Sequence, residues 1–131
     1  MKVTILTVAY NCAGTISRAI ESVLQQTYDN IEYIIVDGAS IDGTLSVAEG
    51  YRKQFSDRGY DYRIVSEPDK GMYDALNKGV RLAKGELIGN INADDWYEPE
   101  AVEEMISFYT ETNYDIAWAD LNIIKVSGNM V

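Results

Sequence analysis

The sequence predicts an α/β fold built on a mostly parallel, Rossmann-like sheet with helices on both faces. Strand patterns and helix patterns alternate from one end of the 131 residues to the other. The segment "IEYIIVD" (Ile31–Asp37) ends in a continuous apolar run, which is typical of a strand buried on both faces. Because such alternation requires crossover connections, the strands are expected to run parallel, with helices packed on the sheet.

Two strand–helix units fill the first half of the chain. The β-branched, apolar run Val3–Ala9 predicts the first strand, and apolar residues at helical spacing over 16–24 predict the first helix. The second strand is predicted at Ile31–Asp37. A second helix is predicted over 43–54, with three inward-facing residues, Leu45, Ala48 and Tyr51.

The second half of the chain continues the alternation. Strands are predicted at 61–67, at 86–92 and, last, at 114–126. The helix between the first two is predicted from residues at helical spacing, namely Met72, Ala75, Leu76, Gly79, Val80 and Ala83. The last helix is predicted to begin at Pro99, which suits the first helical position, and to bury Val102, Met105, Ile106 and Tyr109.

Composition narrows the classes of function. The net charge of −10 argues against a nucleic-acid binder and against a polybasic membrane patch. Because the chain has no histidine, it contains neither a Ser-His-Asp triad nor a histidine-based zinc site. Its single cysteine, Cys12, excludes a disulfide framework and indicates a reducing compartment.

Polar residues follow four of the predicted strands. They are Tyr10 and Asn11, Asp37, residues 67–70 and residues 92–95. Ligands of open α/β sheets bind outside the carboxyl ends of the strands, so these four loops are expected to form one site. The chain has neither a P-loop nor a G-x-G-x-x-G turn, so a bound nucleotide would need its phosphates held in another way.

The acidic residues of these loops each have two interpretations. Asp94 and Asp95 form a carboxylate pair that suits Mg²⁺ or Mn²⁺ bound together with substrate phosphates. The same pair could be no more than the acidic start of the next helix. Asp37 is either a hydrogen-bond acceptor for a base or a ribose, or a turn residue that opens "DGAS".

The sequence pattern alone also leaves more than one interpretation for the neighbouring residues. Lys70 and Gly71 either meet a phosphate at a helix N-terminus or belong to the ordinary surface. Asn77 follows Asp74 by three residues, a spacing typical of a solvated helix face. Cys12 is interpreted as a small buried loop residue, because nothing near it in the sequence would lower its pKa.

Two long blocks carry a family resemblance. In "TVAYNCAGTISRAIESVLQQTYDNIEYIIVDGASIDGT", a strand, an Asn-containing turn and a helix precede an Asp-ending strand and an S-x-D-G-T turn. In "SEPDKGMYDALNKGVRLAKGELIGNINADDWYEP", a G-x-x-x-A-x-N-x-G helix precedes the acidic pair. Together and in this order, the blocks resemble the family 2 glycosyltransferases of the GT-A fold, over nearly the whole chain.

The resemblance implies an inverting, metal-dependent glycosyltransferase of bacterial surface polysaccharide synthesis. The donor would be a nucleotide-diphosphate sugar, with a UDP-sugar favoured, and the acceptor a glycan or a lipid-linked group. Asp37 would contact the base, while Asp94 and Asp95 would hold Mg²⁺ or Mn²⁺, whose Lewis acidity stabilises the departing diphosphate. The full set implied for the nucleotide sugar is Ala9, Tyr10, Asn11, Asp37, Lys70, Gly71, Asn77, Asn92 and Asp94.

The chain departs from the family pattern in three respects. Asn92 stands where many members have Asp, and Gly38 replaces a second acidic residue that often follows Asp37. Members are also longer, and their second half carries acceptor contacts and a carboxylate general base. We therefore expect residues 1–131 to be a single GT-A-like domain truncated at its C-terminus, with the base beyond Val131; Asp120 is not assigned that role.

The sequence leaves two alternative functions. A nucleotide-binding module without turnover would result if the acceptor half is absent. A sugar-1-phosphate nucleotidyltransferase would need a Gly-rich, basic loop after the first strand, and "AYNCAGT" supplies neither feature. We further expect a cytoplasmic location, with attachment to the inner membrane face through parts outside this chain, and a homodimer formed through exposed apolar surface.

Overall fold

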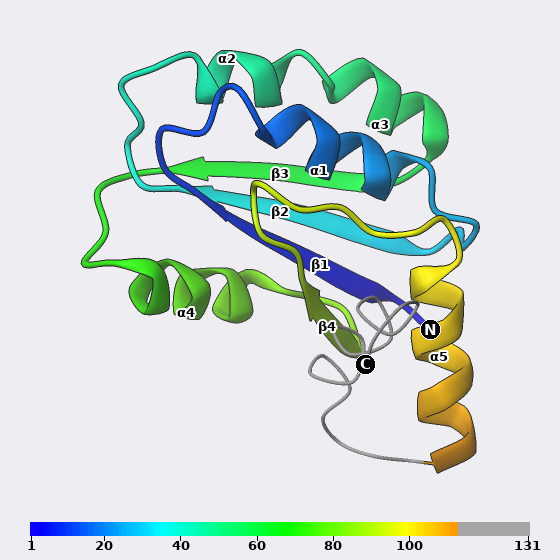
Figure 1. Cartoon of the computed structure of the whole chain (residues 1–131). Helices are drawn as coiled ribbons and strands as arrows, with labels where there is room; N and C mark the ends of the chain where they lie inside the picture. Colours follow the sequence, from blue (N-terminus) through cyan, green and yellow to red (C-terminus); the bar gives the residue numbers. More distant parts are fainter. Residues whose placement is uncertain (113–131) are drawn as a thin grey trace.

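The computed structural model describes residues 1–112 and contains a four-stranded sheet with five helices around it (Figure 1). In chain order the elements are β1 Val3–Ala9, α1 Ile16–Leu24, β2 Ile31–Asp37, α2 Thr44–Glu49, α3 Arg52–Arg58, β3 Asp61–Ser66, α4 Met72–Leu82, β4 Leu87–Asn90 and α5 Ala101–Thr112. The predicted strand at 114–126 and Asp120 lie outside the described residues.

All four strands run parallel in the order β3-β2-β1-β4, which confirms the predicted sheet. β1 pairs along its whole length with β2, and its first half pairs with β4, from Val3 opposite Leu87 to Leu6 opposite Asn90. The strand order therefore reverses at β1. A crevice opens at such a reversal, outside the carboxyl ends of the strands, and ligands bind there in open α/β sheets.

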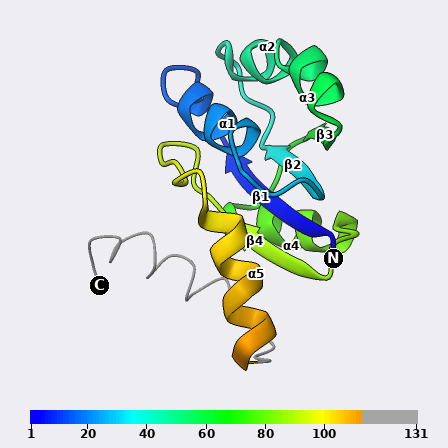
Figure 2. The same cartoon turned by 90° about the vertical axis from the view of Figure 1, so that its right-hand side faces the viewer.

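Helices cover both faces of the sheet, as predicted. Helices α1, α2 and α3 lie on one side of the strands and α4 on the other, which both views show (Figures 1 and 2). The larger core joins α1, α3 and α5 to one face of β1 and β2, with Tyr33 and Phe55 among its fully buried side chains. The smaller core lies under α4 and consists of Leu6, Ile34, Val36 and Ala75.

The predicted helix over 43–54 was wrong, because the structure contains two helices there. Tyr51 donates its N–H to the carbonyl of Ala48, three residues back, so the helix tightens and breaks between α2 and α3. The break directs Phe55 into the core, where its ring stacks on Tyr62 with the centroids 4.1 Å apart. Ala48 is buried as predicted, whereas Leu45 and Tyr51 are only partly covered.

Three smaller predictions also need correction. Met72 and Val80 do not face inward on α4; they are 61% and 48% exposed, whereas the buried residues of this helix are the small Ala75 and Gly79. Helix α5 begins at Ala101, since the carbonyl of Pro99 accepts from Thr27 instead of entering the helix. Strand β4 ends at Asn90, two residues before the predicted end.

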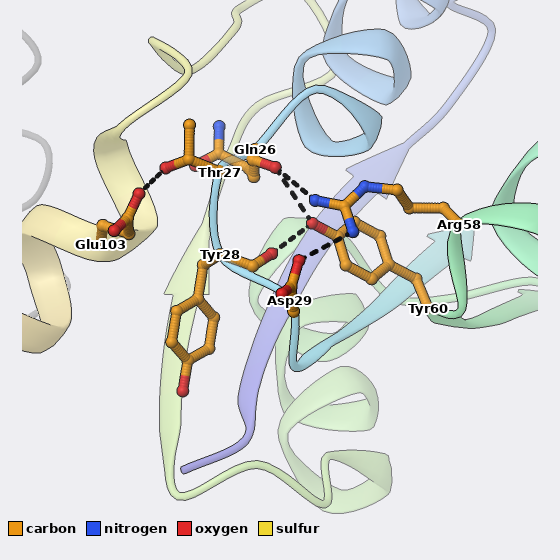
Figure 3. A network of polar contacts seen from close by, with 7 residues as sticks. All are labelled: Gln26, Thr27, Tyr28, Asp29, Arg58, Tyr60 and Glu103. Atoms are coloured by element: carbon orange, nitrogen blue, oxygen red, sulfur yellow. Dashed lines mark hydrogen bonds and ion pairs between the residues drawn. The ribbon is translucent and has the colours of Figure 1, made fainter.

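The amino edge of the sheet is closed by a network around Gln26, which follows α1 (Figure 3). The carbonyl of Gln26 accepts hydrogen bonds from Arg58 Nη2 at 2.6 Å and from the Tyr60 hydroxyl at 3.3 Å. Its side-chain amide, which is buried, bridges to the carbonyl of Glu98 at 2.8 Å and to the N–H of Val102 at 3.0 Å. The network therefore ties the end of α1 to α3, to the residue before β3 and to α5.

None of the helices in residues 1–112 combines the length and the apolar character that crossing a bilayer requires.

Candidate functional site

A cleft of about 550 Å³ lies at the carboxyl edge of the sheet, on the α4 side. Residues that follow β1, β2 and β4 form its floor and walls, and the first turns of α4 complete it. The lining residues are Val8, Ala9, Tyr10, Gly38, Pro68, Asp69, Gly71, Met72, Leu76, Asn90 and Asn92. The volume is typical of a small-molecule site, and the position is the one expected at the strand reversal.

The loop after β1 is held by the S-x-D-G-T turn after β2. Three consecutive backbone N–H groups donate to that turn: Asn11 to Ser40 Oγ at 2.8 Å, Cys12 to Thr44 Oγ1 at 2.8 Å and Ala13 to Asp42 Oδ2 at 3.1 Å. In return, Asn11 Oδ1 accepts from the N–H of Ile41 at 2.9 Å. Each polar residue of the turn thus satisfies one backbone donor next to Tyr10.

Asp42 is the charged member of that turn. Its carboxylate also accepts from the hydroxyl and the N–H of Thr44, at 2.5 and 2.9 Å. These hydrogen bonds, with that from Ala13, hold the pKa of the Asp42 carboxyl below its usual range. The exposed carboxylate is therefore ionised at neutral pH while it orders the loop.

Asp37 is 1% exposed and lies beneath the same loops. Its carboxylate accepts from Ser66 Oγ at 2.7 Å, from the Ser40 N–H at 2.9 Å and from the Ser40 hydroxyl at 2.5 Å. These bonds hold the β2 loop, in which Ala39 adopts a left-handed φ of 62°. That conformation is unfavourable for a residue other than glycine, so the surrounding hydrogen bonds must stabilise it.

The loop between β3 and α4 forms the opposite wall of the cleft. Gly71 ends the loop with φ of 121°, a value that favours glycine. Its N–H donates to Asp69 Oδ1 at 3.0 Å, and the N–H of Lys70 donates to Asp74 Oδ2 at 2.9 Å. The side chain of Lys70 is exposed at the mouth of this loop, and residue 70 is not among those that line the cleft.

The loop after β4 carries the acidic pair. The buried hydroxyl of Tyr97 donates to the carbonyl of Asn90 at 2.8 Å and so closes the loop; burial raises the pKa of that hydroxyl, which keeps it protonated. Trp96 packs under the guanidinium of Arg18, with 4.6 Å between the Arg18 Cζ atom and the ring centroid. Asp94 lines a separate hollow of about 390 Å³ beside α1.

The structure brings some of the predicted residues together and separates others. Ala9, Tyr10, Gly71 and Asn92 line the cleft. Asn11 and Asp37 lie directly behind it and are bonded to its loops. Lys70, Asn77 and Asp94 do not line it: Asn77 is exposed on α4, and Asp94 faces the hollow beside Arg18. The ligand roles assigned to all of these residues stay predictions.

The acidic pair can supply part of the ligand set of a hard divalent cation. Within residues 1–112, no group of three or more acidic or thiol side chains surrounds a point where a metal could bind. Asp94 and Asp95 would supply two carboxylates, and the remaining oxygens would come from a bound phosphate or water. Mg²⁺ and Mn²⁺ are commonly held in this way, so the donor set fits such a metal.

Sequence reasoning placed residues 67–70 at the site but assigned no role to Asp69, and it missed the ordering role of the S-x-D-G-T turn. Asp69 lines the cleft, in the stretch "SEPDKG" whose predicted ligand contacts were Lys70 and Gly71. The available signal was its place after a predicted strand, next to residues already assigned to the site. The hydrogen bonds from the β1 loop to Ser40, Asp42 and Thr44 join residues about thirty positions apart, so no local sequence pattern predicts them.

Comparison with known proteins places this architecture among sugar-transferring enzymes. A family model described as "Glycosyl transferase family 2" matches residues 4–129. A chondroitin synthase of Escherichia coli is 39% identical over 101 residues, which are 77% of this chain and 14% of that protein. The glucosyltransferase WfaP of Escherichia coli is 35% identical over 126 residues, covering 94% of this chain and 47% of WfaP.

A solved structure shares the fold. The mannosyltransferase PcManGT of Pyrobaculum calidifontis, solved in complex with GDP-Man and Mn²⁺, superposes with a TM-score of 0.77 at 27% identity. The superposition covers 85% of this chain and 33% of that protein. The chain therefore spans less than half the length of each of these relatives.

Proposed function

Because the chain belongs to glycosyl transferase family 2 and has the N-terminal part of the GT-A fold, we propose that it binds the donor of a sugar-transfer reaction. The observation that carries this proposal is the cleft at the strand reversal, which Tyr10, Asp69, Gly71 and Asn92 line. The proposed donor is a nucleotide-diphosphate sugar, and the reaction is inverting transfer to a glycan or lipid-linked acceptor in surface polysaccharide synthesis.

The relatives' names support the donor and acceptor classes. WfaP is named for transfer of glucose from UDP-Glc to a GlcNAc-diphosphoundecaprenol, which pairs a UDP-sugar with a lipid-linked acceptor. PcManGT was solved with GDP-Man, so the titration described below must identify which nucleotide base this chain binds. A UDP-sugar is the donor we favour, and a cytoplasmic site of action belongs to the same proposal.

In the proposed complex, the metal would be held beside the cleft and the nucleoside at its rim. Asp94 and Asp95 would hold Mg²⁺ or Mn²⁺ beside the diphosphate, and the metal would supply Lewis-acid stabilisation of the leaving group. Gly71 and Met72 begin α4 at the cleft, but the N–H groups of Lys70 and Gly71 already donate to Asp74 and Asp69, so the phosphates are not assigned to this helix end. Tyr10, 63% exposed at the rim, would pack against the nucleoside.

A calorimetric titration tests this proposal. UDP, GDP and dTDP are titrated into the chain with Mn²⁺ and then with EDTA, and the series is repeated on Asp94→Asn and Asp95→Asn. We expect one nucleotide to bind with the metal, and each variant to weaken binding about tenfold or more, since a lost charge-assisted ligand costs about that much. Asp29→Asn, an exposed acid at the opposite edge, is the matched control and should bind like the original chain.

The outcomes separate the leading function from its alternative. Binding together with hydrolysis or transfer of a UDP-sugar supports a transferase. Binding without either reaction supports a nucleotide-binding module. If none of the three nucleotides binds with or without metal, the donor-site proposal is wrong, and the acidic pair is a solvated loop.

A further inference from the structure

Helix α4 and the residues that flank it carry a local excess of positive charge in an acidic chain. Residues 70–84 contain four of the 11 basic residues, Lys70, Lys78, Arg81 and Lys84, and one of the 21 acidic residues, Asp74. Four cations against one acid give this segment a net charge of +3, while the whole chain has −10. The overall charge argued against a basic patch because it averages this segment with the acidic remainder.

The cations at the C-terminal end of α4 are not neutralised by neighbouring acids. Lys78 Nζ lies 3.2 Å from Glu67 Oε1 and 3.7 Å from Asp74 Oδ2, so that cation is committed. Arg81 and Lys84 are exposed, and within residues 1–112 neither forms an ion pair. Two cations of this segment are therefore free to meet an anionic partner.

Helix α3, on the other side of the sheet, has its basic residues paired instead. Arg52 pairs with Glu49, Lys53 Nζ lies 2.8 Å from Asp57 Oδ2, and Arg58 Nη1 lies 3.1 Å from Asp29 Oδ1. The two helices lie on opposite faces of the strands (Figures 1 and 2). The positive potential is therefore expected on the α4 side of the molecule.

The outward side of α4 also exposes apolar side chains. Tyr73 is 81% exposed and Val80 is 48% exposed. The buried residues of the helix are Ala75 and Gly79, which face β1 and β2. Because successive helical residues are about 100° apart, Tyr73 and Arg81 lie about 200° around the helix from these buried positions. Apolar and basic side chains therefore share the side of α4 that points away from the sheet.

An anionic lipid surface offers a partner to both kinds of side chain. Its phosphate groups attract Arg and Lys, and Tyr and Val can enter the boundary between the head groups and the acyl chains. A soluble polyanion would satisfy the cations but would leave the apolar side chains in water. An apolar protein surface would cover Tyr73 and Val80 but would remove two unpaired cations from water, which is costly.

We propose that the α4 strip, defined as Tyr73, Val80, Arg81 and Lys84, docks on an anionic membrane surface. The helix lies parallel to the membrane, with the two apolar side chains at the acyl boundary and the two cations at lipid phosphates. The docking itself does not depend on the donor site. Where the proposed function also holds, Met72 joins the strip to the cleft, so docking keeps the cleft near the membrane surface, where a lipid-linked acceptor is held.

Co-sedimentation of the chain with lipid vesicles tests the proposal. Vesicles of equal parts phosphatidylglycerol and phosphatidylcholine are compared with vesicles of phosphatidylcholine alone, and the bound fraction is measured against lipid concentration. We expect the anionic vesicles to bind about tenfold or more tightly than the neutral ones, since each cation near an anionic surface contributes about a fivefold gain. Added salt should weaken this binding, because it screens exposed charges.

Two double variants with the same change of charge separate the α4 strip from the net charge. Arg81→Gln with Lys84→Gln should weaken binding to anionic vesicles by about tenfold or more. Arg52→Gln with Lys53→Gln, on α3, is the matched control and should bind within about twofold of the original chain. All four side chains are at the surface, so both variants are expected to fold, which urea titrations check.

The apolar part of the strip is tested by Tyr73→Ser with Val80→Ser. We expect this variant to bind anionic vesicles about tenfold more weakly, since it loses the apolar area that the membrane would bury. Its binding to soluble polyphosphate should not change. Ile41→Ser is the matched control, because Ile41 is a highly exposed apolar side chain outside the strip.

Three results would overturn the membrane docking. The first is no binding to anionic vesicles, or an equal loss in the α3 control. The second is full vesicle binding by the Tyr73→Ser, Val80→Ser variant together with displacement of the vesicles by polyphosphate, which would assign the strip to a soluble polyanion. The third is a dimer in light scattering that this variant dissociates, which would assign the strip to a second copy of the chain.

The same variants keep this inference apart from the donor site. UDP titrations of Arg81→Gln with Lys84→Gln should match those of the original chain, because neither residue lines the cleft. A chain that binds anionic vesicles but no nucleotide refutes only the donor site. A chain that binds a nucleotide but no vesicle refutes only the docking of α4.

Discussion

The two edges of the sheet each have a buried polar side chain at their centre. At the amino edge, the Gln26 amide makes three hydrogen bonds, to the carbonyls of Ser22 and Glu98 and from the N–H of Val102. At the carboxyl edge, the Asp37 carboxylate also accepts three, two from Ser40 and one from Ser66. Gln26 is 2% exposed and Asp37 1%.

The partners of these two side chains differ. The Gln26 side chain bonds only to backbone groups, which belong to α1, α5 and the turn before α5, so it closes the amino edge. Figure 3 shows the contacts of the Gln26 carbonyl, which are with side chains. Asp37 bonds mostly to serine hydroxyls, of Ser40 in the loop after β2 and of Ser66 at the end of β3, and the cleft opens beside them. We therefore expect the amino edge to contribute more to stability, while the loops of the carboxyl edge surround the cleft.

Gln26→Ala is expected to give the largest effect on stability. The substitution leaves the buried Val102 N–H without its partner, which costs about 1–3 kcal/mol, and removes the two bonds that the amide donates, although the Glu98 carbonyl keeps its bond from the Ala101 N–H. We expect the free energy of unfolding to fall by about 2–4 kcal/mol in urea titrations.

Gln25→Ala is the matched control for that substitution. Gln25 is the neighbouring residue and the same type, but it is exposed and its side chain makes no hydrogen bond within the described residues. Its replacement should change stability by less than about 0.5 kcal/mol. Equal losses for the two variants would show that the amino edge does not depend on Gln26.

The fold was predictable because its signals are local. The continuous apolar run of β2 and the β-branched run of β1 gave the bounds that the structure has, Ile31–Asp37 and Val3–Ala9. The break between α2 and α3 was not predictable in this way. Both halves satisfy a helical pattern, and the break serves the packing of Phe55 on Tyr62, a tertiary contact.

The site was predictable only as far as strand ends determine it. Tyr10, Gly71 and Asn92 follow or flank strand ends and reach the cleft. Asp94 also follows a strand, but the turn after Asn92 directs it beside α1. The position of the Asp69 carboxylate, which fills the space above Gly38, could not be predicted from the sequence, because it depends on two loops thirty-one positions apart meeting over the same point.

Asp37→Asn tests the carboxyl edge and should have a smaller effect on stability. An amide oxygen can replace one carboxylate oxygen, and the serine hydroxyls can turn to accept from the new NH₂ group. We expect the loss in unfolding free energy to be about 1 kcal/mol, the usual contribution of one hydrogen bond. UDP affinity, measured by calorimetry on the folded variant, should fall by about tenfold, because the loops around the cleft lose their fixed geometry.

The two measurements on Asp37→Asn, of unfolding free energy and of UDP affinity, separate the stability of the fold from ligand binding. A variant that weakens UDP binding more than it weakens the fold supports a carboxyl edge specialised for binding. If Asp37→Asn were instead as destabilising as Gln26→Ala, the two edges would be equivalent in stability, and the difference drawn between them would be wrong.

The smallest effect is expected within the amino edge itself, at the ion pair of Asp29 and Arg58. Asp29 Oδ1 lies 3.1 Å from Arg58 Nη1, but the Asp29 side chain is 89% exposed, and exposed pairs of this kind contribute little. Arg58 also donates to the Gln26 carbonyl at 2.6 Å and lies over the Tyr60 ring, 4.4 Å from its centroid. Asp29→Ala should therefore change the unfolding free energy by less than about 0.5 kcal/mol, and Arg58→Ala by about 1–2 kcal/mol. Urea titrations of the two variants and their double mutant measure the difference: if Asp29→Ala cost as much as Arg58→Ala, the amino edge would be stabilised by surface charge rather than by the buried bonds around Gln26.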